Sequence, residues 1–145
     1  MRAHQFSWIT LSIVGAVMGL AALWVALTPA GDQTELRGRT WDQFAQQDVE
    51  VASLYSMDLV VLGILGAGFG FLIVALAVVP FRHGERWAWA VLWLVPITIG
   101  AVALRMLASQ YAVGYFYAGL AVAALVALVL PARGLIARGG RVSPP

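Results

Sequence analysis

The sequence predicts an all-α membrane protein: a four-transmembrane-helix bundle with an external amphipathic helix in its first loop. Of the 145 residues, 61% are hydrophobic and only 11% are charged, whereas a soluble domain is about 45–50% apolar and about 25% charged. Four apolar stretches each approach the roughly 20 residues that cross a hydrocarbon core about 30 Å thick. They are residues 6–27, 59–79, 87–107 and 113–130, within one transmembrane domain at residues 1–131.

Charge in the connections predicts the orientation. Six arginines precede the first stretch, occupy the second connection or follow the fourth stretch, whereas the loop at residues 28–58 holds only two arginines and most of the acids. By the positive-inside rule, both termini are cytoplasmic and this loop is external. We therefore expect a multi-pass protein of the cell (plasma) membrane, with the lipid bilayer as its first partner.

The first stretch, residues 6–27, has one alternative interpretation, a cleaved signal peptide. Met1-Arg2 is a minimal basic start, and Thr28-Pro29-Ala30 offers small residues for cleavage. The apolar regions of signal peptides run about 7–15 residues, which is shorter than this stretch. The length therefore favours a transmembrane helix.

The external loop at residues 28–58 predicts a helix of its own. Thr40 with Gln43 forms a capping box, and neither glycine nor proline follows before Gly63. Apolar side chains from Trp41 to Tyr55 recur at helical spacing. The segment either lies on the outer membrane surface or extends the second span outward, and the sequence leaves both alternatives open.

Small residues form stripes in the first two spans. Such stripes let helix backbones approach closely in lipid. One interpretation is an interface with a second copy or a partner protein; the other, which we favour, is contact between the first two spans of one chain. The glycines are Gly15 and Gly19 in the first span and Gly63, Gly66 and Gly70 in the second.

Two prolines modify the last two spans. Pro96 removes a backbone hydrogen bond and predicts a kink in the third span, with Thr98 or a neighbouring helix satisfying the freed carbonyl. Pro131 follows the fourth stretch. Residues 132–145, rich in glycine and arginine, are expected to form a disordered cytoplasmic tail.

One polar constellation stands out at the expected outer boundary. Asp58 opens the second span and Arg105 closes the third, so both belong at the same depth, where an ion pair satisfies two charges that are costly in lipid. The pair is either a structural salt bridge that fixes helix register, or part of an outward-facing pocket for a headgroup or small ligand with Ser109, Gln110 and Tyr111. A lipid-facing Arg105 that extends to the headgroups is the other structural interpretation.

The composition excludes several kinds of chemistry. The chain has no cysteine and two histidines, so thiol catalysis and cysteine-ligated metals are impossible. We expect no catalytic residue, metal ligand or cofactor. No basic stripe of the kind that binds nucleic acid is present.

Two segments carry a resemblance. Gly38-Arg39-Thr40-Trp41 and the run from Arg82 to Trp89 resemble segments of small uncharacterised four-helix membrane proteins of prokaryotes. The resemblance covers about a dozen residues, implies the same topology and assigns no activity or residue role.

Three functions fit these features. We favour a non-enzymatic interaction or accessory subunit that binds another membrane protein, a second copy of itself or lipid. A small oligomeric transporter or channel is the first alternative, although no charge lies in the middle of any span. A membrane enzyme with Asp58 or Glu50 as general base and Arg105 as anion clamp is the second.

Overall fold

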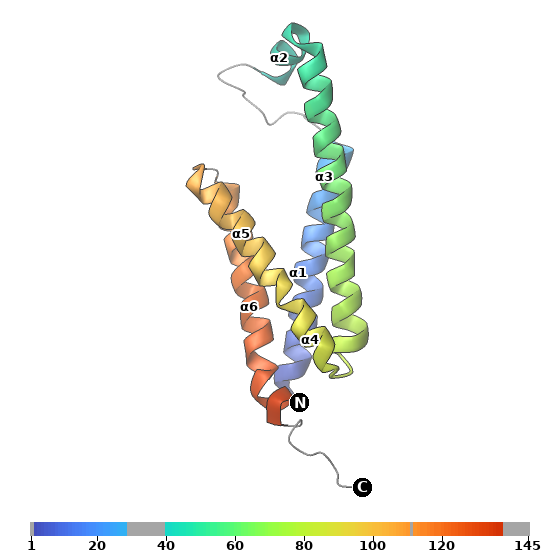
Figure 1. The fold of residues 1–145 in the computed structure, drawn as a ribbon, viewed down its shortest axis with the longest axis vertical. Coiled ribbons are helices and arrows are strands. Elements are labelled where there is room, and N and C mark those ends of the chain that lie inside the picture. The colour runs from blue at the N-terminus through green and yellow to red at the C-terminus, as the bar shows by residue number, and fades with distance from the viewer. Residues whose placement is uncertain (1, 29–39, 111, 138–145) are drawn as a thin grey trace. The chain divides into compact units, whose positions relative to one another are not determined.

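The computed structural model describes residues 2–28, 40–110 and 112–137, and every regular element in these ranges is a helix (Figure 1). Four helical segments are long and apolar enough to cross a membrane. This confirms the predicted all-α class and the number of apolar spans. The segments are His4–Leu27, Val49–Phe81, Arg86–Ala108 and Val113–Ala132.

The chain divides into two compact units. Unit 1 comprises Met1–Ala16 and Leu72–Pro145, and unit 2 comprises Val17–Phe71. Helix α1 (Arg2–Leu27) and helix α3 (Val49–Leu76) each contribute residues to both.

In unit 2, helix α2 (Trp41–Gln47) begins with the predicted capping box. The Gln43 backbone N–H donates to Thr40 Oγ1 at 3.4 Å, and the Thr40 N–H donates to Gln43 Oε1 at 3.2 Å. Two N–H groups that have no partner within the helix are thereby satisfied. The prediction of a helix start at Thr40 is confirmed.

The helix does not continue unbroken, because Asp48 starts a new one. The Val51 N–H donates to Asp48 Oδ1 at 3.3 Å, and the Ala52 N–H donates to the Asp48 carbonyl at 3.0 Å. Aspartate is a strong N-cap residue, so α2 ends at Gln47 and α3 begins at Val49. The predicted second span, residues 59–79, lies within the longer helical segment Val49–Phe81, and its boundary in the membrane stays a prediction. Residues 49–58 extend this helix, and α2 is a separate element.

Helix α3 continues into a short π-helix, η1 (Ala77–Phe81), which contains Pro80. Proline has no N–H and its ring crowds the preceding turn, and the wider π turn accommodates it. The Arg82 N–H accordingly donates to the carbonyl five residues back, that of Ala77, at 3.0 Å. Gly84, with φ of 83°, makes the turn into the next helix, which a residue with a side chain would strain.

The third span is interrupted at Trp93, between α4 (Arg86–Leu92) and α5 (Leu94–Ala108). Pro96 causes this, because its ring crowds the carbonyl four residues earlier, that of Leu92. The expected distortion is present, but the Thr98 hydroxyl does not satisfy the Leu92 carbonyl. It donates to the carbonyls of Leu94 and Val95, at 2.8 and 3.1 Å.

Helix α6 (Val113–Ala137) contains Pro131 and continues past it. The prediction of a disordered tail is therefore wrong for residues 132–137, and residues 138–145 lie outside the described ranges. Pro131 removes only one intrahelical bond, that to the Ala127 carbonyl, and the apolar and alanine residues after it favour helix. The Trp89 indole N–H also donates to the Leu128 carbonyl at 3.0 Å, which ties α4 to α6 one turn before the proline.

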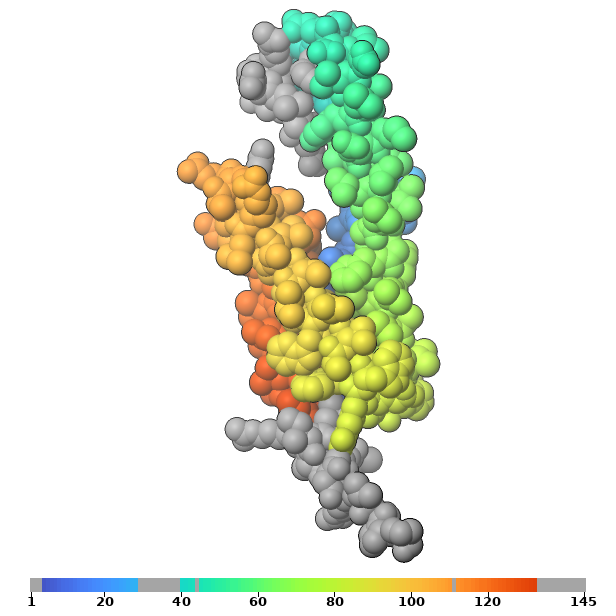
Figure 2. All heavy atoms as spheres, viewed as in Figure 1, coloured from blue at the N-terminus to red at the C-terminus, as the bar shows by residue number. Residues whose placement is uncertain are grey.

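The core of unit 1 contains side chains from α1, the end of α3, η1, α4, α5 and α6, and α5 and α6 pack side by side as an antiparallel pair (Figure 1). Outside the core, large apolar side chains are exposed along every span. Figure 2 shows the atoms of α3 in green on the face in view. The largest fully buried side chains are Phe81, Leu11, Ile73, Leu92, Ile99 and Leu128.

Candidate functional site

The predicted polar site lies partly at the end of α5 in unit 1. Arg105 occupies the last turn of this helix, and the Ser109 N–H donates to its carbonyl at 3.2 Å. Gln110 has φ of 62° and donates its N–H to the Leu107 carbonyl at 2.9 Å. Ser109 is the C-cap of α5, and the left-handed Gln110 that follows it ends the helix. The structure thus groups Arg105, Ser109 and Gln110 at one exposed helix terminus.

The other members of the predicted site are placed differently. Tyr111 lies outside the described residues. Asp58 is an exposed residue of α3 in unit 2, so it belongs to a different unit from Arg105. The ion pair between them stays a prediction. Arg105 itself is well placed to stabilise the α5 terminus, where the helix dipole favours a cation.

Three of the predicted packing glycines, Gly19, Gly63 and Gly66, lie where α1 and α3 meet in unit 2. A Cβ atom on Gly63 would lie 2.7 Å from the Ala22 carbonyl oxygen and from the Ala26 backbone nitrogen, and one on Gly66 would lie 2.8 Å from the Ala22 Cβ. At Gly19 the nearest atom would be the Ala67 carbonyl oxygen, at 3.5 Å. These glycines form a close contact between the first two spans of one chain. Gly15 and Gly70 are also buried.

A second polar feature, which the sequence analysis did not identify, surrounds the turn after η1 in unit 1. We call His4, Trp8, Phe81 and Arg82 the basic–aromatic cluster. The Arg82 guanidinium lies over the Trp8 ring, 5.1 Å from the ring centroid. The backbone carbonyl oxygen of Arg82 lies 3.1 Å from His4 Nε2. The His4 and Phe81 rings meet edge to face at 5.2 Å. Such cation–π and aromatic contacts hold the turn against the start of α1.

The sequence carries only a faint signal for this cluster. His4 and Trp8 are four residues apart and share a helix face, but nothing local connects them with a turn 74 or more residues later. Spatial proximity across such a separation follows from the fold and not from any motif.

Beside this cluster, the start of α4 presents a free cation. The Trp87 indole N–H donates to the Glu85 carboxylate, so the acid of this turn already has a partner. Arg86 is exposed and makes no hydrogen bond or ion pair within the described part of the chain. The Trp89 and Trp93 rings meet edge to face at 5.9 Å on the same helical segment.

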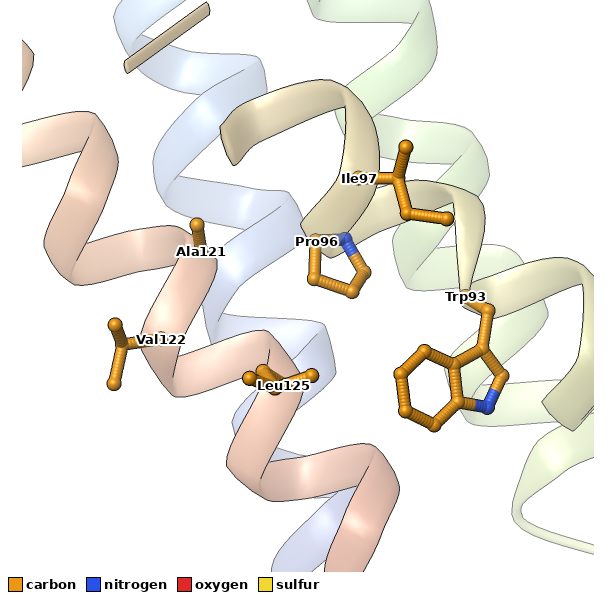
Figure 3. Close-up of a pocket in the computed structure, with 6 residues that line it drawn as sticks. All are labelled: Trp93, Pro96, Ile97, Ala121, Val122 and Leu125. Atoms are coloured by element: carbon orange, nitrogen blue, oxygen red, sulfur yellow. The ribbon is translucent and has the colours of Figure 1, made fainter. Parts of the chain in front are cut away.

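An apolar groove of about 210 Å³ opens between the third and fourth spans (Figure 3). Trp93, Pro96 and Ile97 form one wall, and residues of α6 form the other. Ile97 and Val122 are well exposed at its rims, 61% and 59% respectively. The α6 residues are Ala121, Val122 and Leu125.

Charge is distributed very unequally between the units. Counted from the sequence, unit 1 holds seven of the nine arginines and one of the seven acids, whereas unit 2 holds two arginines and six acids. Unit 1 therefore carries the positive potential of the protein. It has the chemistry to attract anions.

Within residues 2–28, 40–110 and 112–137, no three His, Asp or Glu side chains group together as metal ligands would. Arginines, indoles and apolar walls dominate the features above, and these groups recognise phosphate and hydrocarbon.

Fold and site together define an all-α protein with four apolar helices of membrane-spanning length. No protein-family model, curated protein or solved structure gives a significant match to the chain.

Proposed function

We propose that this chain is a non-enzymatic integral membrane protein that binds lipid or another membrane protein as an interaction or accessory subunit. The main support for this proposal is that large apolar side chains are exposed along all four spans. Only 22% of the most apolar window of each span is buried within the chain. Apolar surface of this extent needs a lipid or protein neighbour.

The proposal includes a topology. Six of the nine arginines lie near the termini or in the connection at residues 82–86, whereas residues 28–58 hold six of the seven acids. The positive-inside rule assigns arginine-rich connections to the cytoplasm. Both termini and the turn at Arg82 are then cytoplasmic, in the cell membrane. Helix α2 and the start of α3 are external, where the short amphipathic α2 contacts water and not the hydrocarbon core.

A labelling experiment tests the topology cleanly because the chain has no cysteine. Single-cysteine variants Gln46→Cys and His83→Cys place one thiol on α2 and one on the turn after η1, both at exposed positions. A membrane-impermeant maleimide added to intact cells is expected to label the first variant only. Labelling of both, or protein released from membranes by alkaline carbonate, would refute the membrane placement.

Purification in native-lipid polymer discs tests the binding role. We expect a stoichiometric membrane protein, a second copy of the chain or a retained lipid class in the particles. Particles that contain one copy of the chain, no second protein and no enriched lipid class would refute the binding role. The predicted pair is tested by Asp58→Cys with Arg105→Cys, which a short bifunctional maleimide should join if the two residues are neighbours.

A further inference from the structure

We propose that unit 1 binds an anionic phospholipid, with the phosphate at Arg86 and one acyl chain in the groove between the third and fourth spans. The inference rests on the proposed membrane function and names the ligand class. It joins two features of the same unit, a cation that has no partner among the described residues and an apolar groove.

The two features lie in line on one helix face. At about 100° per residue, Arg86, Ala90, Trp93 and Ile97 recur at intervals that keep them on the same side of the helix. The interruption at Trp93 preserves this face, because Trp93 keeps right-handed helical angles, φ −64° and ψ −21°. The small Ala90 leaves a path between the arginine and the groove.

The spacing matches the depth of one lipid leaflet. At about 1.5 Å per residue, Ile97 lies roughly 16 Å beyond Arg86 along the helix axis. Half of a hydrocarbon core about 30 Å thick is about 15 Å. A lipid with its phosphate at Arg86 therefore places its acyl chain beside Trp93 and Ile97, where the groove opens (Figure 3).

The electrostatics favour an anionic headgroup. Arg86 is exposed, and the one acid in unit 1, Glu85, accepts the Trp87 indole N–H. A guanidinium binds phosphate through two parallel hydrogen bonds. The excess of arginine in unit 1 adds a positive potential that discriminates between anionic and zwitterionic headgroups.

The groove itself favours a hydrocarbon chain over a protein helix. Transmembrane helices associate through small residues that bring backbones together. Here only Ala121 is small, and the other lining side chains are bulky, with Ile97 and Val122 projecting at the rims. A flexible acyl chain can lie between such side chains, whereas a helix backbone is held away from them.

Native mass spectrometry of the full chain tests the proposal, with phosphatidylglycerol and phosphatidylcholine of identical acyl chains as probes. We expect stronger binding of phosphatidylglycerol, and a loss of about fivefold in Arg86→Gln, the effect of one arginine near an anionic surface. Arg86→Lys should retain most of the preference. Arg82→Gln is the matched control: it removes the same charge, but Arg82 lies over Trp8 and not in line with the groove.

A second pair of variants tests the groove. Ala121→Leu fills the groove and should weaken the binding of both lipids equally. Gly119→Leu is the control: it adds the same side chain about 160° around α6, where a Cβ meets nothing within 4 Å. It should leave the binding of both lipids unchanged. Circular dichroism confirms that each variant is folded.

Three results would overturn the inference: equal affinity for the two lipids, equal losses in Arg82→Gln and Arg86→Gln, or unchanged binding in Ala121→Leu. Cross-linking from Ile97→Cys to another protein chain would also overturn it, because a helix would then occupy the groove. These failures differ from failure of the proposed function. A protein that stays in carbonate-washed membranes but shows no lipid preference loses only the lipid site.

Discussion

The contact between α1 and α3 in unit 2 makes a quantitative prediction for Gly63→Ala. The new Cβ would lie 2.7 Å from the Ala22 carbonyl oxygen and the Ala26 nitrogen. Both are backbone atoms, so the helices must move apart. Overpacking of this kind costs about 1–3 kcal/mol, and alanine returns about 0.5–1 kcal/mol through its lower conformational entropy cost in a helix. We expect a net loss of about 1–2 kcal/mol in the free energy of unfolding.

The assay is equilibrium unfolding in mixed micelles, followed by circular dichroism as the denaturing detergent is increased. Gly68→Ala is the matched control on the same helix, because a Cβ there meets nothing within 4 Å. It should be neutral or more stable by up to about 1 kcal/mol. Equal unfolding midpoints for the two variants would refute the close approach of the helices at Gly63.

Three further substitutions test local features. Thr40→Ala removes the cap of α2 and should cost about 1 kcal/mol, seen as faster amide exchange at Gln43; unchanged exchange would contradict the capping box. Trp89→Phe loses the 3.0 Å bond to the Leu128 carbonyl and should lower the free energy of unfolding by about 0.5–1.5 kcal/mol. Gln110→Gly relieves a φ of 62° and should raise the free energy of unfolding by about 0.5–1 kcal/mol, measured as a higher unfolding midpoint. A lower midpoint would show that the side chain stabilises this turn.

Local chemistry made part of this fold predictable. The capping box at Thr40 depends on two side chains three residues apart, and the four apolar spans depend on continuous composition, so both can be read along the chain. The effect of Pro96 was predictable in kind, because a ring always crowds the carbonyl four residues earlier. Its outcome, a break at Trp93, depends on how the neighbouring backbone adjusts.

The features that escaped prediction depend on competition or on long-range contact. Asp48 can lie inside a helix or cap the start of one, and the spacing of residues in the sequence does not show which of the two is more stable. The tail after Pro131 was expected to be disordered, but α6 continues to Ala137. The stacking of Arg82 on Trp8, like the groove beside Trp93, joins segments far apart in the chain. Neither has a local signature.

The outward extension of α3 has a mechanical consequence. Residues 49–58 add about 15 Å of helix and contain neither glycine nor proline. They contact α2 through the rings of Trp41 and Tyr55, whose centroids are 5.5 Å apart. A rod of this kind has no hinge at which to bend. A force applied to α2 therefore tilts or rotates α3 as a rigid helix. The contact of Gly63 with α1 is then the point about which α3 pivots.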